Sequence, residues 1–560
     1  MDYPTFTEIE QLYNAEIHRL TDGTEALDKR RPLLPLYRDI LADMETPVSA
    51  YCKTAQQPYS FLLESVTGGE HVKRYSFIGI DPYLVLIQRN DIATLLHMRY
   101  EQHQISPQTT REDIPCFDPL KLVEMELGHY RLVTSVHTTQ DHLPTFHGGA
   151  VGYLAYDAAA RFERLPVPPP NELNLPLAVF TFTETVLVFD HVKHRVRAVT
   201  HLHLDAPDLD AEYQRGLAIL DDIQQRLLRP ASLPTEPEPI SDPEALRVTS
   251  NRTKEEFEDM VTRSIEYIRA GDIFQVVPSQ RLSRHVNASP FTVYRALRAI
   301  NPSPYMFFLD LEDFHIIGAS PELLVRYEDQ EVTIRPIAGT RPRGHDKQSD
   351  EQLATELQQD VKERAEHIML LDLARNDVGR VSKVGSIEVS DFMTIERYSH
   401  VMHLVTNVAG QLREDVSPFE ALRAGFPAGT VSGAPKIRAM EIISELEGEQ
   451  RGVYAGAVGY FSHSGNQETA IALRTMVIKD GRAYIQAGGG VVADSIPENE
   501  YQESLNKAKA QLRALDEAEN IARDIVSIRQ QQRAGTVGVV PCADPVPCAT
   551  GVHSPYEEER

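Results

Sequence analysis

The sequence contains no tryptophan and only four cysteines among its 560 residues. Four thiols are too few for a disulfide scaffold at this length, and none of them belongs to a close Cys/His set of the kind that binds zinc. We therefore expect reduced cysteines and no thiol nucleophile. The cysteines are Cys52, Cys116, Cys542 and Cys548.

Basic residues are also scarce, because 56 Lys and Arg face 82 Asp and Glu, which gives a formal charge of −26. This balance argues against nucleic acid as a partner, since phosphate backbones are bound by clustered basic side chains. No run of about 18 apolar residues and no basic-then-apolar N-terminus occurs, so we expect neither a membrane span nor a signal peptide. We predict a folded cytoplasmic protein.

Composition shifts divide the chain into four parts. Residues 1–228 begin with a polar, helix-like stretch and continue with short β-rich runs, and residues 229–250 are rich in proline, which predicts a linker or a surface excursion. Residues 251–522 alternate amphipathic helical stretches with apolar strand-like runs and hold most of the unusual motifs. Residues 523–560 are predicted to form a disordered tail.

One helix is predicted to start at Ser349, where residues 349–352 match a capping box. Its expected apolar stripe has helical spacing, and Glu363 and Glu366 share a face roughly opposite that stripe. A solvated surface is the ordinary explanation of such a pair. Residues 368–373 are nearly all apolar, however, so we expect the helix to enter the interior there and Glu366 to lie at the lip of a buried site. The stripe consists of Leu353, Leu357, Val361, Ala365 and Ile368.

A second helix is predicted to start at Ser495, where residues 495–498 match another capping box. Glu500 and Glu503 again stand three residues apart, away from the apolar stripe. Two helices that each offer a carboxylate pair could converge on one hard cation, for which Mg²⁺ is the favoured candidate. Spacing alone does not distinguish this site from two solvated helix surfaces.

Two glycine-containing segments add a possible pocket. Residues 488–490 are three glycines that follow a predicted strand, which permits a close approach by a ligand or by another part of the backbone. Residues 429–436 lead into a helical run, so their free N–H groups could hold an anion. Neither segment fits a dinucleotide or P-loop pattern, and a carboxylate is therefore the better candidate than a nucleotide phosphate.

Four segments together resemble the chorismate-utilising enzymes, and within them most closely the large subunits of anthranilate synthase. The resemblance runs in order from about residue 48 to residue 515. It implies a large α/β (α+β) fold of two sheets that enclose a cleft, with helices packed outside. The absence of tryptophan fits an enzyme that must be translated when tryptophan is scarce. The four segments are Pro336–Gly344, Leu371–Asp377, Gly429–Lys436 and Gln486–Val492.

The resemblance implies a lyase that converts chorismate and ammonia to anthranilate and pyruvate, the first step of tryptophan biosynthesis, with Mg²⁺ as cofactor. Matching positions assign Glu366 and Glu503 as the principal metal ligands, with Glu363 and Glu500 in a secondary role. The substrate-binding positions are Gly339, Thr340, Tyr454, Arg474, Gly488, Gly489 and Gly490. The catalytic positions are Glu322 as general acid, His403 for proton handling or ring positioning, Gln275, and Thr430 at the start of the anion-binding turn.

Two residues distinguish the branches of this family. Water-adding relatives carry a lysine base at the position of Gln275, and an amide cannot act as a base. Aminodeoxychorismate synthases typically carry a lysine where this chain has Ala338. Both residues favour anthranilate synthase, and aminodeoxychorismate synthase is the alternative enzyme.

The resemblance also implies a partner and an inhibitor. The chain has no Gly-x-Cys-x-Gly glutaminase motif, so ammonia is expected from a separate glutamine amidotransferase subunit. Residues 62–65 together with residues 304–306 resemble the family's tryptophan-binding feedback site, although a polar turn beside a strand could be purely structural. A non-catalytic tryptophan-sensing paralogue is the alternative from another class. The effector positions are Ser65, Pro304, Tyr305 and Met306.

Overall fold

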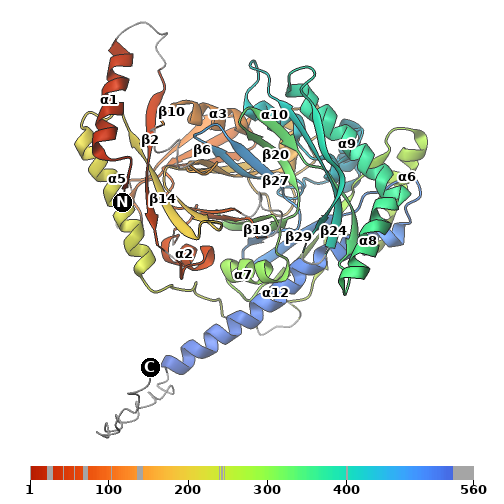
Figure 1. The fold of residues 1–560 in the computed structure, drawn as a ribbon. Helices are drawn as coiled ribbons and strands as arrows, with labels where there is room; N and C mark the ends of the chain where they lie inside the picture. Colours follow the sequence, from red (N-terminus) through yellow and green to blue (C-terminus); the bar gives the residue numbers. More distant parts are fainter. Residues whose placement is uncertain are drawn as a thin grey trace, which may run out of the picture.

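The computed structural model describes residues 2–21, 29–41, 43–55, 57–66, 74–101, 104–106, 108–134, 143–238, 240, 244, 246–398 and 401–533. The predicted tail beyond residue 533 lies outside this set. Figure 1 shows two large sheets at the centre of the molecule with helices around them. The helices are α1 (Phe6–Thr21), α2 (Pro47–Thr54), α3 (Pro119–Gly128), α5 (Leu209–Leu228), α6 (Lys254–Ala270), α7 (Pro290–Ile300), α8 (Lys347–Gln359), α9 (Val361–Val381), α10 (Pro418–Gly425), α11 (Lys436–Glu447) and α12 (Pro497–Arg533).

The first sheet has 13 strands. Its order is β1 (Asp2–Tyr3), β2 (Arg31–Ile40), β14 (Arg195–His203), β13 (Val186–Asp190), β4 (Tyr75–Gly79), β3 (Phe61–Glu64), β18 (Tyr305–Asp310), β19 (Phe314–Ser320), β28 (Thr475–Lys479), β29 (Arg482–Gly488), β17 (Ser279–His285) and β15 (Thr249–Ser250), with β10 (Tyr130–Leu132) beside β2.

The second sheet has 12 strands. Its order is β22 (Ile337–Pro342), β24 (Val401–Gln411), β21 (Glu331–Ile334), β20 (Leu323–Glu328), β27 (Gln467–Ile471), β26 (Ala457–Ser462), β11 (Gly149–Leu154), β12 (Ala178–Thr183), β5 (Leu84–Arg89), β6 (Ile92–His97) and β9 (Thr110–Pro115), with β23 (Glu388–Arg397) beside β24. Two short pairs complete the set, namely β16 (Gln275–Val276) with β25 (Gly433–Ala434) and β7 (Tyr100–Glu101) with β8 (Gln104–Ile105).

Three apolar layers hold the sheets and helices together. Aromatic side chains of both sheets, including Phe77, Phe307 and Tyr460, pack against one another in the layer between them. Apolar side chains of α2, α5, α7 and α12 cover the outer side of the first sheet, and those of α3, α6, α10 and α11 cover the second. The predicted architecture of two sheets with helices outside is therefore confirmed.

The N-terminal and C-terminal parts of the chain share both sheets. Leu62 of β3 is paired with Phe308 of β18, and Leu154 of β11 is paired with Ala457 of β26. The proline-rich segment forms no helix or strand within residues 229–238, and its Glu236 carboxylate accepts hydrogen bonds from the Ser289 N–H (2.7 Å) and the Thr292 hydroxyl (2.7 Å) at the start of α7. That segment is thus fastened to the start of α7 in the C-terminal half of the chain.

The single helix predicted from Ser349 is wrong, because the segment forms two helices. Asp346 caps α8 by accepting from the Ser349 N–H, and Asp360 caps α9 by accepting from the N–H groups of residues 362 and 363. A capping residue favours the start of a new helix over continuation of the preceding one. Its side chain accepts from N–H groups that would otherwise bond to carbonyls of the preceding turn. The predicted stripe fails at this break, where Val361 is 82% exposed.

The second predicted helix exists as α12, but its start and end differ from the prediction. The Ser495 hydroxyl accepts from the Val492 N–H (3.0 Å), and Glu498 pairs with Lys254, so the predicted box does not form. The helix also continues through Arg533, past residue 523 where the tail was predicted to begin. Figure 1 shows this helix running along the molecule and projecting from it toward the C-terminus.

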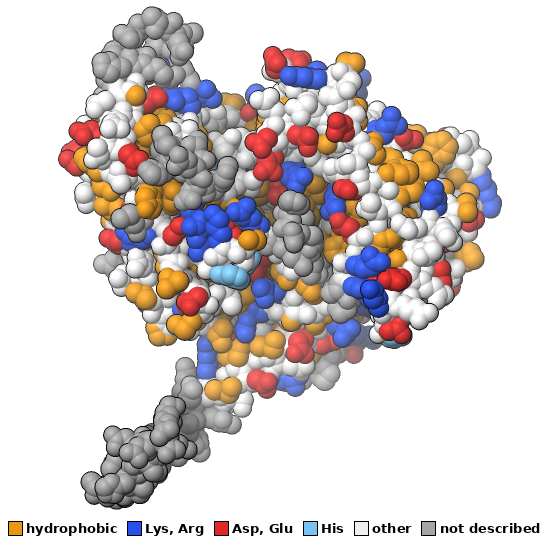
Figure 2. All heavy atoms as spheres, in the orientation of Figure 1, with side chains coloured by type: hydrophobic (Ala, Val, Ile, Leu, Met, Phe, Trp, Pro, Cys, Tyr) orange, Lys and Arg blue, Asp and Glu red, His pale blue; other side chains and the backbone are white. Residues whose placement is uncertain are grey.

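The surface matches the charge composition. On the face drawn in Figure 2, acidic and basic side chains are interspersed, and no continuous basic surface crosses it. Within the described ranges, no helix is long and apolar enough to cross a membrane.

Candidate active site and effector cavity

The four predicted metal carboxylates lie close together, although they come from two helices. Glu363 and Glu366 project from the first turns of α9, and Glu500 and Glu503 from the first turns of α12. The glycines beside them leave the necessary room, because a Cβ atom on Gly489 would lie 2.8 Å from Glu500 Oε2, and one on Gly339 would lie 3.1 Å from Glu363 Oε2. The structure thus brings the carboxylate quartet to one place.

The orientation of the first pair differs from the prediction. Glu363 and Glu366 are half-buried and stand on the inward side of α9, one turn before the buried His367 and Leu370. They are not opposite the apolar face, as the helix pattern had suggested. The helix also does not become buried all round after Glu366, since Ile368 is 45% exposed. Glu366 is half-buried and accepts from the Gln275 amide, and its position at the lip of a buried site stays a prediction.

The carboxylates repel one another, although two of them already have a cationic partner: Arg341 pairs with Glu363 (3.1 Å) and Lys507 pairs with Glu503 (2.8 Å). Burial raises the pKa of Glu366, the Gln275 amide opposes this by donating to Oε1 (3.1 Å), and the charges of Glu363 and Glu503 raise it further. Burial likewise raises the pKa of Glu500, whose Oε2 atom is buried without a hydrogen-bond partner. A cation would relieve both effects, so the residues fit one. As these side chains lie, no three His, Cys, Asp or Glu groups among the described residues converge closely enough to ligate it.

Lys507 is a cation beside this quartet that the sequence reasoning did not identify. Its ammonium donates to Glu503 Oε1 (2.8 Å) and to the Gly488 carbonyl (3.0 Å). The lysine lies one helical turn after Glu503, and this i, i+4 spacing was the available signal.

Glu322 has the environment of a neutral carboxylic acid. It connects β19 to β20, is 6% exposed, and accepts a hydrogen bond from the Thr430 hydroxyl (3.0 Å). Burial raises its pKa to about 8, although Thr430, the Ile337 N–H and the charge of Arg474 act in the opposite direction. The group is therefore largely protonated at pH 7, which a general acid requires.

Arg474 lies close enough to this acid to affect its pKa, and Tyr454 lies beside Gly488 at the start of the three-glycine segment. Arg474 follows β27 with φ of 49°, and burial lowers its pKa, so it is not the surface ion pair that a strand end would ordinarily carry. Tyr454 is 8% exposed, and burial raises the pKa of its hydroxyl to about 12 while the Gly488 backbone hydrogen-bonds to it. A guanidinium and a phenol in a dry pocket are suitable donors for a substrate carboxylate.

His403 is neutral and fixed in one tautomer. Its Nδ1 faces the Gly339 carbonyl (2.8 Å) and the Thr340 hydroxyl (3.2 Å), so Nδ1 carries the proton. Burial lowers the pKa of the ring to about 4. Within the described part of the chain, Nε2 is buried without a partner and remains available as an acceptor.

The turn at residues 429–436 positions Gln275. Its β25 pairs with β16, which places Gln275 opposite Ala434. Lys436 donates to Asp377 (2.8 Å) in a buried ion pair that joins two of the sequence motifs. Asp377 and Lys436 were part of the quoted motifs, but the sequence gave no indication that they meet. Anion binding at this turn stays a prediction.

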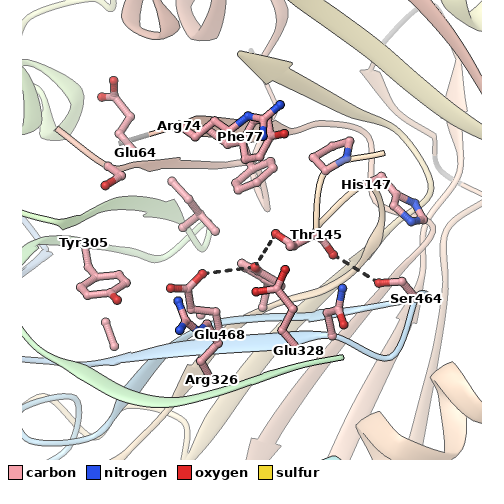
Figure 3. Close-up of a pocket in the computed structure, with 18 of the residues that line it drawn as sticks. Glu64, Arg74, Phe77, Thr145, His147, Tyr305, Arg326, Glu328, Ser464 and Glu468 are labelled. Carbon is pink, nitrogen blue, oxygen red and sulfur yellow. Dashed lines mark hydrogen bonds between the residues drawn. The ribbon is translucent and has the colours of Figure 1, made fainter. Parts of the chain in front are cut away.

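The predicted effector residues line a separate cavity of about 1010 Å³. Ser65 at the end of β3 and residues 304–306 at the start of β18 form one side of it. Among the residues that the structure describes, the buried Ser65 hydroxyl has no hydrogen-bond partner. Figure 3 shows that charged side chains from neighbouring strands also point into this space, which sequence reasoning missed because they lie far from both segments. These are Arg74, Arg326, Glu328 and Glu468.

The chain is similar to known proteins. The family model described as chorismate binding enzyme matches residues 93–513. The chain belongs to the chorismate-binding enzyme family. It is 48% identical to anthranilate synthase component 1 of Pseudomonas putida over 492 residues, which cover 87% of this chain and 96% of that protein. It is 45% identical to anthranilate synthase component 1 of Acetivibrio thermocellus over 503 residues, or 89% of this chain and 99% of that one.

Solved structures agree with this assignment. Anthranilate synthase component I from Streptococcus pneumoniae superimposes with a TM-score of 0.66 at 38% identity, covering 85% of this chain and 99% of that one. The menaquinone-specific isochorismate synthase from Escherichia coli superimposes with a TM-score of 0.63 at 16% identity, which is evidence of the shared fold alone. The predicted resemblance to anthranilate synthase large subunits and the predicted fold class are confirmed.

Proposed function

We propose that the chain forms anthranilate and pyruvate from chorismate and ammonia. The observation that carries the proposal is Glu322, a buried carboxyl group with a pKa of about 8 near the half-buried Arg474. Ammonia would add at C2 of chorismate, the C4 hydroxyl would leave, and pyruvate would then be eliminated. Loss of a hydroxyl needs a proton, and Glu322 is the group that retains one at neutral pH.

The other buried groups would bind and orient the dianionic substrate. Arg474 and the Tyr454 hydroxyl are suited to the enolpyruvyl carboxylate, with N–H groups of Gly488–Gly490 along the same wall. His403 would accept a hydrogen bond at Nε2, because Nδ1 is occupied by Gly339. Fixed donors and acceptors of this kind lower the barrier by holding the ring in a reactive orientation.

We propose Mg²⁺ as the cofactor, held by Glu366 and Glu503 with Glu363 and Glu500 beside them. The ion would neutralise the ring carboxylate and withdraw electron density from the ring. The unpartnered Glu500 oxygen and the raised pKa values of Glu366 and Glu500 support a cation at this position.

Gln275 and Ala338 are the residues that favour ammonia as the nucleophile at C2. Gln275 is 3% exposed and its amide donates to Glu366, so it can orient a small molecule but cannot remove a proton from water. Ala338 offers no amine, in contrast to aminodeoxychorismate synthases.

Incubation with chorismate, Mg²⁺ and ammonium should give fluorescent anthranilate. Isochorismate or 4-amino-4-deoxychorismate as the main product would contradict the proposal, and no turnover would favour a non-catalytic paralogue.

Changing Gln275 to Lys should depress anthranilate formation, because the new ammonium would lie against the Glu366 carboxylate and compete with the cation. If metal binding frees the lysine as a neutral amine, some water should add and isochorismate should appear. Chromatography of the products measures both effects. Gln275→Leu is the control for lost amide contacts, and isochorismate from that variant would mean that the lysine is not its cause.

Ammonia would come from a separate glutamine amidotransferase subunit in the cell, since the sequence contains no glutaminase motif. Accordingly, the isolated chain should use ammonium but not glutamine. Glutamine-dependent anthranilate formation by the isolated chain would contradict this part of the proposal.

We further propose that tryptophan inhibits the enzyme by binding in the cavity at Ser65. Ser65→Phe should abolish this inhibition while ammonia-dependent turnover stays within about twofold, because damage to one of two coupled sites uncouples them. Inhibition curves with tryptophan measure the effect. Ser464→Phe, at the exposed opposite end of the cavity (Figure 3), is the matched control and should remain inhibited. Unchanged inhibition in Ser65→Phe would move the effector site elsewhere.

A further inference from the structure

A buried ion pair between Glu447 and Arg451 lies directly behind the proposed substrate pocket. Glu447 is the last residue of α11, and Arg451 follows after the left-handed cap at Gly448. The two side chains are 5% and 3% exposed. The guanidinium binds the carboxylate at two points, from Nε (2.9 Å) and from Nη2 (2.6 Å). We call these two residues the clamp pair.

The remaining donors of the guanidinium reach two other segments of the pocket. Nη2 donates to the Val277 carbonyl (2.6 Å), two residues after Gln275, and Nη1 donates to the Val431 carbonyl (2.8 Å), next to Thr430. Because an arginine fork is planar, these bonds fix the two carbonyls relative to each other. One side chain therefore holds the segment that carries Gln275 against the segment that carries Thr430.

The clamp pair also reaches the other wall of the pocket. The Arg451 guanidinium lies 5.5 Å from the centre of the Tyr454 ring, a cation–π distance. Glu447 Oε1 accepts from the N–H and the hydroxyl of Ser279 (2.8 Å each), and Ser279 pairs with Gly488. The three-glycine segment thus starts on a strand anchored to the same carboxylate.

The charges favour a fixed arrangement. Burial opposes the positive charge of Arg451, but the charge and hydrogen bonds of Glu447, together with Tyr156 and Tyr454, outweigh burial and raise the pKa of the arginine. A buried pair of this kind contributes little net stability compared with apolar residues, although removal of one partner is costly. Such pairs are therefore better explained by the geometry that they impose than by the stability that they add.

We infer that the clamp pair is a positioning unit for the proposed reaction, which sets Thr430, Gln275 and Tyr454 relative to one another without touching the substrate. The inference rests on the proposed function. The inference goes beyond the proposed function because it assigns the spacing of three pocket segments to one buried arginine. Since a shift of about 1 Å in a pocket group can cost two orders of magnitude in rate, the clamp pair should affect turnover strongly.

Arg451→Lys is the decisive variant, because it keeps the charge but loses the planar fork. We expect kcat/KM for chorismate to fall by about 10- to 100-fold, with a higher KM. We also expect the alkaline limb of the pH–rate profile to move to higher pH. The Thr430 hydroxyl lowers the pKa of Glu322, so a displaced Thr430 would let that pKa rise. Thr430→Val should reproduce the same shift.

The surface variant Arg263→Lys is the matched control, since its partner Glu445 is exposed and the pair should contribute little. Thermal unfolding and calorimetric chorismate binding are measured alongside. A lower melting temperature with unchanged KM, affinity and pH limb would make the pair merely structural and overturn the inference. If Arg451→Lys does not fold, Glu447→Asp is judged by the same criteria. Absence of anthranilate from the wild type would instead contradict the proposed function.

Discussion

Glu322→Gln should lower kcat by about 10²- to 10⁴-fold, because an amide cannot donate the proton that the leaving C4 hydroxyl requires. The substitution preserves shape and can still accept from the Thr430 hydroxyl, which lies 3.0 Å from Oε1. Chorismate affinity should therefore change little. Initial rates of anthranilate formation over a range of chorismate concentrations separate the two parameters.

The pH dependence gives a second measure of the same residue. The wild type should lose activity as pH rises through about 8, where burial sets the pKa of Glu322, because the acid then loses its proton. Since this pKa is raised in the folded state, ionisation of Glu322 destabilises the fold as pH rises from the ordinary glutamate range toward 8. Glu322→Gln removes that penalty, so at pH 8 the variant should be at least as stable as the wild type.

Glu331→Gln, at an exposed position on β21, is the control and should retain wild-type rates. Two results would contradict the assignment of Glu322 as general acid. One is a rate in Glu322→Gln within about tenfold of the wild type. The other is a pH–rate profile of Glu331→Gln in which activity no longer falls as pH rises through about 8.

The amino-acid sequence predicted which residues gather at the site better than it predicted how they gather. The i, i+3 pairs at Glu363 and Glu366 and at Glu500 and Glu503 were visible because helix periodicity is local. The break at Asp360 was not predicted. The apolar stripe favours one continuous helix and the cap favours a new one, and the sequence pattern does not show which has the lower free energy. The break also explains why Glu366 points inward. Because α9 is a separate helix, its buried face does not follow from the apolar stripe that was predicted for one continuous helix.

Long-range pairing accounts for most of what remained unforeseen. The contacts of Lys436 with Asp377 and of Arg451 with Val277 join segments 59 and 174 residues apart. No local sequence pattern predicts such a contact. A single buried arginine belongs to no periodic pattern of residues that could be detected in the sequence. The motif resemblance supplied Glu322 and Arg474, whereas the burial that raises the pKa of Glu322 and the effect of the Arg474 charge on it appear only in the folded chain.

The proposed metal site leads to the second large effect. Glu366→Gln and Glu503→Gln should each weaken Mg²⁺ binding and Mg²⁺-dependent activity by about 10- to 100-fold, because each removes a charged oxygen ligand from a different helix. The stability of the metal-free protein should not decrease in either variant. Burial and the neighbouring carboxylates already raise the pKa of Glu366, so a neutral amide at that position relieves repulsion. Calorimetric Mg²⁺ titration of the wild type and both variants measures affinity without reference to turnover.

Thermal unfolding separates this explanation from a loss of structure. An ion that binds only the folded state raises the melting temperature with concentration, so added Mg²⁺ should stabilise the wild type and have much less effect on either variant. Glu517→Gln, at an exposed position further along α12, is the matched control and should respond to Mg²⁺ as the wild type does. Near-normal rates at limiting Mg²⁺ in both quartet variants, with undiminished stabilisation by the ion, would mean that the cation binds elsewhere. The repulsion between the four carboxylates would then be offset by the chain's own cations, among them Arg341 at Glu363 and Lys507 at Glu503.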